Sequence, residues 1–283
     1  MSENAEYKSQ YRNIFEAAEK GSVEDVRFFV ETKGIDVNVK NDNAGETLLQ
    51  FALREKQDID VLKYLIENGA NVNTKDKYGR TPLRSALTKF NVEVLDYLFD
   101  HGADINVVDD CGETLLNCAV YGWEHSHFDK REFDAELLEY LVTKGADLNI
   151  KDKYGITLLH DVVRANFDLD RLKYLIENGA DVNAKNHNGQ TPLFFAVASD
   201  LNIAVIKYMV EKGTDINAKD EDGWTPLHSA SLNSNPEILK YLLDLGSNVN
   251  AKNDEGKTPL DWADTEDKKT ILLQAGGKRG EEL

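Results

Sequence analysis

The sequence predicts an all-α solenoid of about eight stacked units, and two recurring phrases predict it. The first phrase reads Thr-Pro-Leu or Thr-Leu-Leu, and the second is a helix ending of the type Gly-Ala-Asp-Val-Asn. The first begins at Thr47, Thr81, Thr114, Thr157, Thr191, Thr225 and Thr258, in steps of 34, 33, 43, 34, 34 and 33 residues. A fixed period in this range is typical of repeat architectures, in which each unit packs only on its neighbours.

Each unit is expected to begin with a turn that leads into a short helix. In residues 73–106, Lys77-Tyr78-Gly79 has glycine where a turn needs a positive φ. Thr81 suits the N-cap of the helix, where its hydroxyl would accept a hydrogen bond from an unpaired backbone N–H. Pro82 suits the first helical position, because proline lacks an N–H and already has a helical φ.

Two amphipathic helices then complete the unit. Leu83, Ala86 and Leu87 have the spacing of one apolar helical stripe, and apolar residues within 94–99 predict the buried face of a second helix. That helix is expected to end at Gly102, since glycine is common just beyond a helix C-terminus. Neither helix can bury its apolar face alone, so the unit must stack on copies of itself.

The two ends of the repeat array depart from this pattern. The first unit lacks the threonine phrase, and the last has a shortened helix pair. End units of a solenoid are expected to be atypical, because one of their faces meets water. We therefore predict a single domain over 11–277, with a cap at 11–43, six full repeats at 44–254, a second cap at 255–277, and tails at 1–10 and 278–283, the latter frayed.

The 43-residue step indicates an insertion of about ten residues between the two helices of the fourth unit, at 121–134. It contains Trp123, His125, His127 and Phe128, which are candidates for a functional loop. An inert excursion packed on the repeats is the alternative. Two histidines two residues apart fit zinc only with further ligands in place, and none is evident, so no metal is predicted.

These phrases closely resemble the ankyrin repeat family, whose motifs are G-x-T-P-L-H-x-A and G-A-D-V-N. The resemblance runs from about Tyr11 to Ala275. It implies a β-hairpin or turn and an antiparallel helix pair in each repeat. It also implies a concave surface, formed by the hairpin tips and first helices, that binds a protein partner. The motif histidine is present only as His160 and His228, where the family uses it to tie a turn to its neighbour.

The resemblance also implies a possible modification site at the asparagine that ends the second motif. In animal cells an oxygen-sensing enzyme hydroxylates this asparagine in ankyrin domains. The matching positions are Asn73, Asn106, Asn149, Asn183, Asn217 and Asn250. Their ordinary role is to stabilise the turn.

Candidate binding residues follow from the family's surface, position by position. They lie beside the turn glycines and at the exposed ends of the first helices. The set is Tyr78, Arg80, Lys89, Tyr154, Ile156, Arg164, Asp222, Trp224 and Asn233. We expect the interface to centre on Tyr78, Tyr154, Ile156 and Trp224, because aromatic residues give large contact areas at a low entropic cost. The alternative for the tyrosines is that they only shield backbone.

Composition limits the classes of partner and compartment. Lys+Arg 33 against Asp+Glu 51 gives a net charge of -18, which argues against nucleic acid or an anionic membrane as the partner. Cys111 and Cys118 have no metal or redox spacing and suit a reducing compartment. With neither a signal peptide nor a membrane-spanning run in the sequence, we expect a monomer in the cytoplasm or delivered into a host cytosol.

The sequence contains no phosphate-binding loop, nucleophile elbow or dinucleotide fingerprint, so neither enzymatic activity nor a cofactor is predicted. Paired carboxylates such as Asp109 and Asp110 read as solvated charge. The leading hypothesis is a protein-binding scaffold, with an effector or inhibitor of a host protein as one form of it. The alternatives are a catalytic, small-ligand or metal-binding protein that uses residues 121–134, and a self-associating structural repeat protein.

Overall fold

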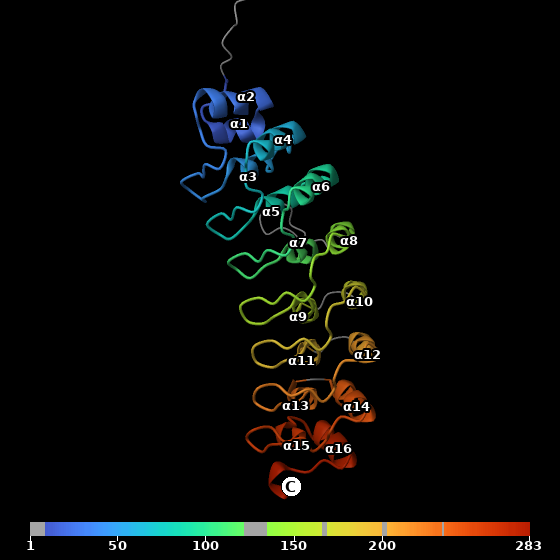
Figure 1. Cartoon of the computed structure of the whole chain (residues 1–283). Helices are drawn as coiled ribbons and strands as arrows, with labels where there is room; N and C mark the ends of the chain where they lie inside the picture. The colour runs from blue at the N-terminus through green and yellow to red at the C-terminus, as the bar shows by residue number, and fades with distance from the viewer. Residues whose placement is uncertain (1–8, 122–134, 166–168, 200–202, 234) are drawn as a thin grey trace, which may run out of the picture. The chain divides into compact units, whose positions relative to one another are not determined.

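The computed structural model describes residues 9–121, 135–165, 169–199, 203–233 and 235–283 (Figure 1). Within these ranges the chain forms sixteen α-helices and no β-strand, apart from one isolated bridge between Lys40 and Thr47. This result confirms the predicted all-α repeat fold. The contacts group the chain into two compact units, residues 1–146 and 147–283, which are described in turn.

The described residues of unit 1, which spans residues 1–146, form four helix pairs. Its first helices are α1 (Ile14–Lys20), α3 (Leu48–Ala52), α5 (Pro82–Leu87) and α7 (Leu115–Tyr121). Its second helices are α2 (Val23–Arg27), which continues as a π-helix (Phe28–Thr32), α4 (Ile59–Glu67), α6 (Val92–Asp100) and α8 (Ala135–Thr143). Helix α1 packs on α3 and α3 on α5, while α2 packs on α4, so like helices stack on like.

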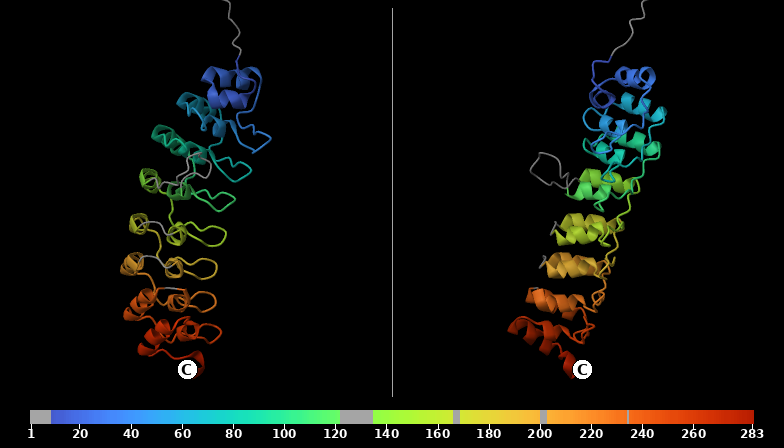
Figure 2. Two further views of the ribbon diagram at one scale, coloured as in Figure 1. Left: turned by 180° about the vertical axis from the view of Figure 1, so that it is seen from behind. Right: turned by 90° about the vertical axis from the view of Figure 1, so that its left-hand side faces the viewer.

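Unit 2, residues 147–283, repeats the same arrangement four more times. Its first helices are α9 (Leu158–Arg164), α11 (Pro192–Ala198), α13 (Pro226–Asn233) and α15 (Pro259–Trp262). Its second helices are α10 (Leu169–Glu177), α12 (Ile203–Glu211), α14 (Pro236–Asp244) and α16 (Glu266–Gln274). The first helices pack on each other in sequence order, and the hairpin loops of this unit project from the same side (Figures 1 and 2).

The apolar stripes predicted from the sequence form the core between the helix pairs. Leu83, Ala86 and Leu87 of α5 are buried, as are Val94 and Leu95 of α6. Burial of these side chains between repeats is the main favourable contribution to the free energy of folding, because a single helix pair can bury little of its apolar surface alone. Gly102, just beyond α6, has a φ of 81°, as predicted for a helix C-terminus.

The threonine phrase begins the first helices, but the predicted capping by the Thr81 hydroxyl is wrong. The third helical N–H, that of Arg84, donates instead to the Thr81 carbonyl at 3.1 Å, which makes a tighter 3₁₀-type first turn. The same bond joins Phe194 N to Thr191 O, in another phrase that contains proline. At Thr47, by contrast, the hydroxyl does cap the helix, because Gln50 N donates to Thr47 Oγ1 at 3.4 Å.

The C-terminal segment 278–283 is ordered, so the expectation of a frayed tail is wrong. Residues Gly280–Glu282 form a 3₁₀-helix, and Gly280 N donates to Asp261 Oδ2 at 2.8 Å. Thr258 Oγ1 donates to Lys278 O, and Lys278 N donates to Asn250 Oδ1. In the other repeats of unit 2 the equivalent asparagine bonds to the following repeat. The bond from Lys278 to Asn250 continues that pattern, since Asp215 N likewise donates to Asn183 Oδ1 at 2.8 Å.

Candidate protein-binding surface

An aspartate or asparagine three or four residues before the turn glycine holds the hairpin turns in shape. Asp76 Oδ1 accepts from the N–H groups of Tyr78 and Arg80, at 2.8 and 2.9 Å. Asp152 does the same for the N–H groups of Tyr154 and Ile156. Sequence reasoning missed this role, although an Asx side chain at a fixed offset before a turn glycine is a known turn signal.

Successive hairpin tips are interlocked through their backbones. In unit 1, Asp110 N donates to Tyr78 O at 3.1 Å, and in unit 2, His187 N donates to Tyr154 O at 2.9 Å. Two features of the turn require glycine at these points, namely a positive φ and a close approach of the next tip. Gly79 has a φ of 77°, and a Cβ at this position would lie 2.7 Å from Asp110 N. The tips therefore present their side chains from a fixed backbone.

Tyr78 and Arg80 form one exposed pair at a tip of unit 1. The Tyr78 side chain is 56% exposed, and the Arg80 guanidinium carbon lies 4.5 Å from the centre of its ring. Arg80 Nε also donates to Asp76 Oδ2 at 2.9 Å, which fixes the guanidinium beneath the ring. The structure thus brings together two of the residues selected from the sequence.

Tyr154 occupies the equivalent tip position in unit 2. It is 62% exposed, and Lys153 Nζ lies 5.2 Å from the centre of its ring. Ile156, two residues further on, is half-buried. The apolar area offered by this tip therefore comes mainly from the tyrosine.

Trp224 lies deeper in the surface than its position beside a turn glycine suggested. The residue is half-buried, and its ring centre lies 4.8 Å from that of Trp262 and 5.6 Å from that of His228. The expectation of an exposed tip side chain does not hold here, because the first helix of the next repeat supplies a large aromatic partner. Much of the Trp224 contact area is used within unit 2.

The remaining candidates are either polar side chains of the described structure or residues outside it. Lys89 is exposed just beyond α5, and Asp222 is exposed at the tip that precedes Trp224. Arg164, at the end of α9, pairs with Asp161 Oδ1 at 2.8 Å. Asn233 ends α13, and its side chain lies outside the described structure, as do the insertion residues Trp123, His125, His127 and Phe128.

His160 and His228 take the structural role that the resemblance implied. His228 is fully buried, its Nδ1 accepts from Thr225 N at 3.1 Å, and its Nε2 lies 3.2 Å from the Lys257 carbonyl of the next repeat. The backbone donor assigns the proton to Nε2, which donates to that carbonyl. Burial, more than any other cause, lowers the pKa of both histidines.

Other residue types occupy this position in the remaining repeats, and only some of them make the tie. Gln50 makes equivalent bonds, accepting from Thr47 N and donating to Arg80 O. Arg84 pairs instead with Asp109 and Glu113, at 2.7 and 3.0 Å. The side chain of Asp109 is only 7% exposed, so its interpretation as a solvated charge is wrong. Sequence reasoning missed this cluster, because its members lie 25 and 29 residues apart.

Several further observations bear on the kind of site this protein carries. No set of three or more His, Cys, Asp or Glu side chains in the described ranges is arranged to hold a metal. Burial raises the pKa of the Cys118 thiol to about 12, while Cys111 is exposed. Among the helices of the described segments, none is long and apolar enough to cross a membrane.

Stacked two-helix units joined by interlocked hairpins define a class of helical repeat protein. The family model for ankyrin repeats (3 copies) matches residues 14–109, 130–220 and 202–274. The chain therefore belongs to the ankyrin repeat family, whose members generally mediate protein–protein interactions. A search of curated proteins found no match.

Proposed function

We propose that the protein is a non-enzymatic binding module that engages a protein partner through its hairpin tips and first helices. The observation that carries this proposal is the exposure of Tyr78 and Tyr154 at equivalent tip positions, 56% and 62% respectively. Large aromatic side chains at exposed positions are enriched among residues that dominate binding energy.

The tips support binding because their geometry is set before a partner arrives. The turn backbone is held by Asp76 or Asp152, and the tyrosine rings lie beside the cations of Arg80 and Lys153. Side chains and loops that are already ordered lose less entropy on association, so more of the contact energy appears as affinity. Trp224 contributes through its exposed edge and by shaping the surface, rather than as a free anchor.

The proposal can be tested by affinity capture with the full chain from lysate of the native host. Tyr78→Ala and Tyr154→Ala should each reduce affinity for the recovered partner by about 30-fold, the equivalent of about 2 kcal/mol for an interface anchor. Val92→Ala and Leu245→Ala are matched controls, because both residues are exposed and apolar but lie at the ends of second helices. Unchanged recovery by both tyrosine variants would refute the tip assignment.

We further propose that the protein acts as a monomer in a cytosol, with an effector or inhibitor of a host protein as one form of this function. Sedimentation at several concentrations tests the first statement, because self-association would raise the apparent mass with concentration. Identification of the captured partner as a host protein would support the second. A partner from the producing cell itself would contradict it.

A further inference from the structure

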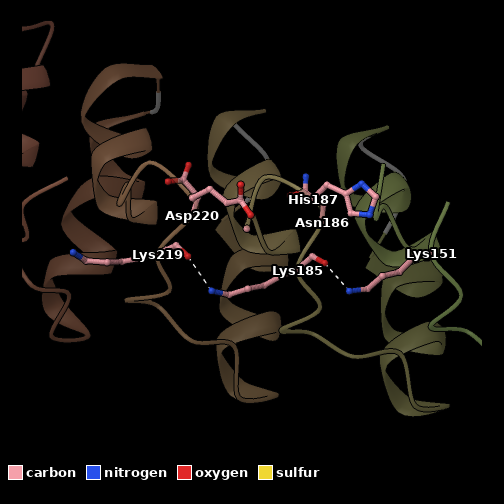
Figure 3. A pocket seen from close by; sticks show the side chains of 8 residues that line it. Lys151, Lys185, Asn186, His187, Lys219 and Asp220 are labelled. Carbon is pink, nitrogen blue, oxygen red and sulfur yellow. Dashed lines mark hydrogen bonds between the residues drawn. The ribbon is translucent and has the colours of Figure 1, made fainter. Parts of the chain in front are cut away.

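Three lysines of unit 2, Lys151, Lys185 and Lys219, lie in register at the stems of consecutive hairpins. Lys151 Nζ donates to Lys185 O at 2.7 Å, and Lys185 Nζ donates to Lys219 O at 2.9 Å (Figure 3). Lys219 Nζ continues the pattern by donating to Lys252 O at 2.9 Å. Each side chain therefore points along the stack toward the next repeat, and we call these three residues the lysine row.

The hydrogen bonds of the lysine row order the side chains without neutralising them. Each of these partners is a neutral backbone carbonyl, and no ion pair within 4.0 Å joins these three ammonium groups to a carboxylate in the described structure. Other cations of the same unit have such partners, as Lys268 has in Asp264. An ammonium group has three donors, so each lysine retains two for an external acceptor.

The neighbouring turn residues leave the charge of the lysine row largely uncompensated. Asp152, which follows Lys151, is occupied by two turn N–H groups, and the residue that follows Lys185 is the neutral Asn186. Carboxylates lie beside the row at one end, where Asp220 and Glu221 line the same surface pocket. Burial is the main cause of the lowered pKa values of His160 and His228. The charge of Lys151 lowers the pKa of His160 further, and the charge of Lys219 lowers that of His228.

We propose that the lysine row binds an extended acidic peptide segment of a partner protein, through the stems of the hairpins and not through the tyrosine side chains at their tips. Packed helices lie about 8–10 Å apart, which sets the spacing of equivalent atoms in successive repeats. A chain in the extended polyproline II conformation advances about 3.1 Å per residue with three residues per turn, so acidic side chains at every third position lie on one face and match that spacing. Holding the lysines in place removes part of the entropy, up to about 2 kcal/mol per side chain, that a free lysine loses on binding.

A spaced carboxylate ligand fits this surface better than a nucleic-acid backbone does. A phosphate chain carries charge continuously and would place phosphates against Asp220 and Glu221 at one end of the row. A peptide with neutral residues between its acidic ones avoids that repulsion. It also avoids concentrating negative charge on a protein whose net charge is -18.

The experiment is an NMR titration of the full chain with a soluble peptide of about nine residues, mostly serine and glycine, with aspartate at every third position. Weak, salt-sensitive binding is expected, with shifts at the amides around Lys185, and Lys→Gln at all three row positions should weaken it by more than about tenfold. Lys240→Gln, which removes an exposed lysine from α14, should leave the affinity unchanged. Lys→Arg at the three positions should retain binding, which separates charge from folding defects.

Four outcomes would overturn the proposal: no binding of the spaced peptide at millimolar concentration, equal binding by the triple Gln variant, equal binding of a peptide with contiguous aspartates, or tighter binding of a single-stranded oligonucleotide through the same lysines. Tyr154→Ala should not change the peptide affinity, because the tyrosine is not part of the row. Failure of the lysine row and failure of the tip assignment are therefore separate results.

Discussion

The tie made by His228 between adjacent repeats gives a direct test of how the units are held together. In a His228→Leu variant, the N–H and hydroxyl of Thr225 would lose their partner in a site that is fully buried. The Lys257 carbonyl would keep its bond from Asn253 N at 2.9 Å. An unpaired buried polar group costs about 1–3 kcal/mol, so two such groups predict a loss of about 3 kcal/mol in the free energy of unfolding.

The chain supplies its own control for this experiment. Because Gln50 Oε1 accepts from Thr47 N and Gln50 Nε2 donates to Arg80 O, a glutamine can make both halves of the tie. His228→Gln should therefore lie within about 1 kcal/mol of the wild type. Urea unfolding followed by tryptophan fluorescence measures both variants, since Trp224 lies against His228. A leucine variant as stable as the wild type, or a glutamine variant as unstable as the leucine one, would refute the reasoning.

Three further predictions follow from the same packing. Because burial lowers the pKa of His160 and His228, the unfolded state takes up protons first. Their contribution to the free energy of unfolding is therefore complete above about pH 6.5 and is lost as the pH falls through the folded pKa values. NMR titration would measure the pKa values, and urea unfolding at several pH values would measure the stability. Gly223→Ala should destabilise by more than about 2 kcal/mol, because its φ is 74° and a Cβ would lie 3.0 Å from the backbone nitrogen of Asp254. Gly246→Ala has a φ of 89° and open space around the new Cβ, so thermal unfolding should show a loss of only about 1–2 kcal/mol. Thr214→Ala should stabilise by about 1 kcal/mol in urea unfolding, because the Thr214 hydroxyl is buried without a partner in the described structure; a destabilised variant would contradict this.

The fold was predictable because its signal is local and repeated. The turn glycine, the proline at the start of a helix and the apolar stripe each act within a few residues, and seven copies of the phrase set the period. The helix pairs, the buried stripe of α5 and the glycine after α6 all agree with that prediction. The hydrogen bonding at the helix N-termini was not predicted correctly, because the hydroxyl and the carbonyl of Thr81 can both accept from the first-turn N–H, and the carbonyl does so.

The candidate site was less predictable, because its geometry depends on contacts between repeats. Tyr78 and Tyr154 are exposed as expected, yet Trp224 is half-buried against Trp262, a residue 38 positions later in the sequence. Likewise, the burial of Asp109 depends on Arg84, which lies one repeat earlier. A pattern that gives the position of a residue within its own repeat does not say which side chain the next repeat places beside it.

The bonds between repeats explain why the tip side chains are free to differ. Successive tips are joined from backbone N–H to backbone carbonyl, as in the bond from Glu221 N to Asn188 O at 2.9 Å. The Asx residue of each turn likewise binds backbone N–H groups, as Asp220 binds that of Trp224. Because these bonds require no particular side chain at the tip itself, substitution there changes the binding surface at little cost to the fold. Replacement of the exposed tyrosines by alanine should therefore leave the free energy of unfolding within about 0.5 kcal/mol of the wild type.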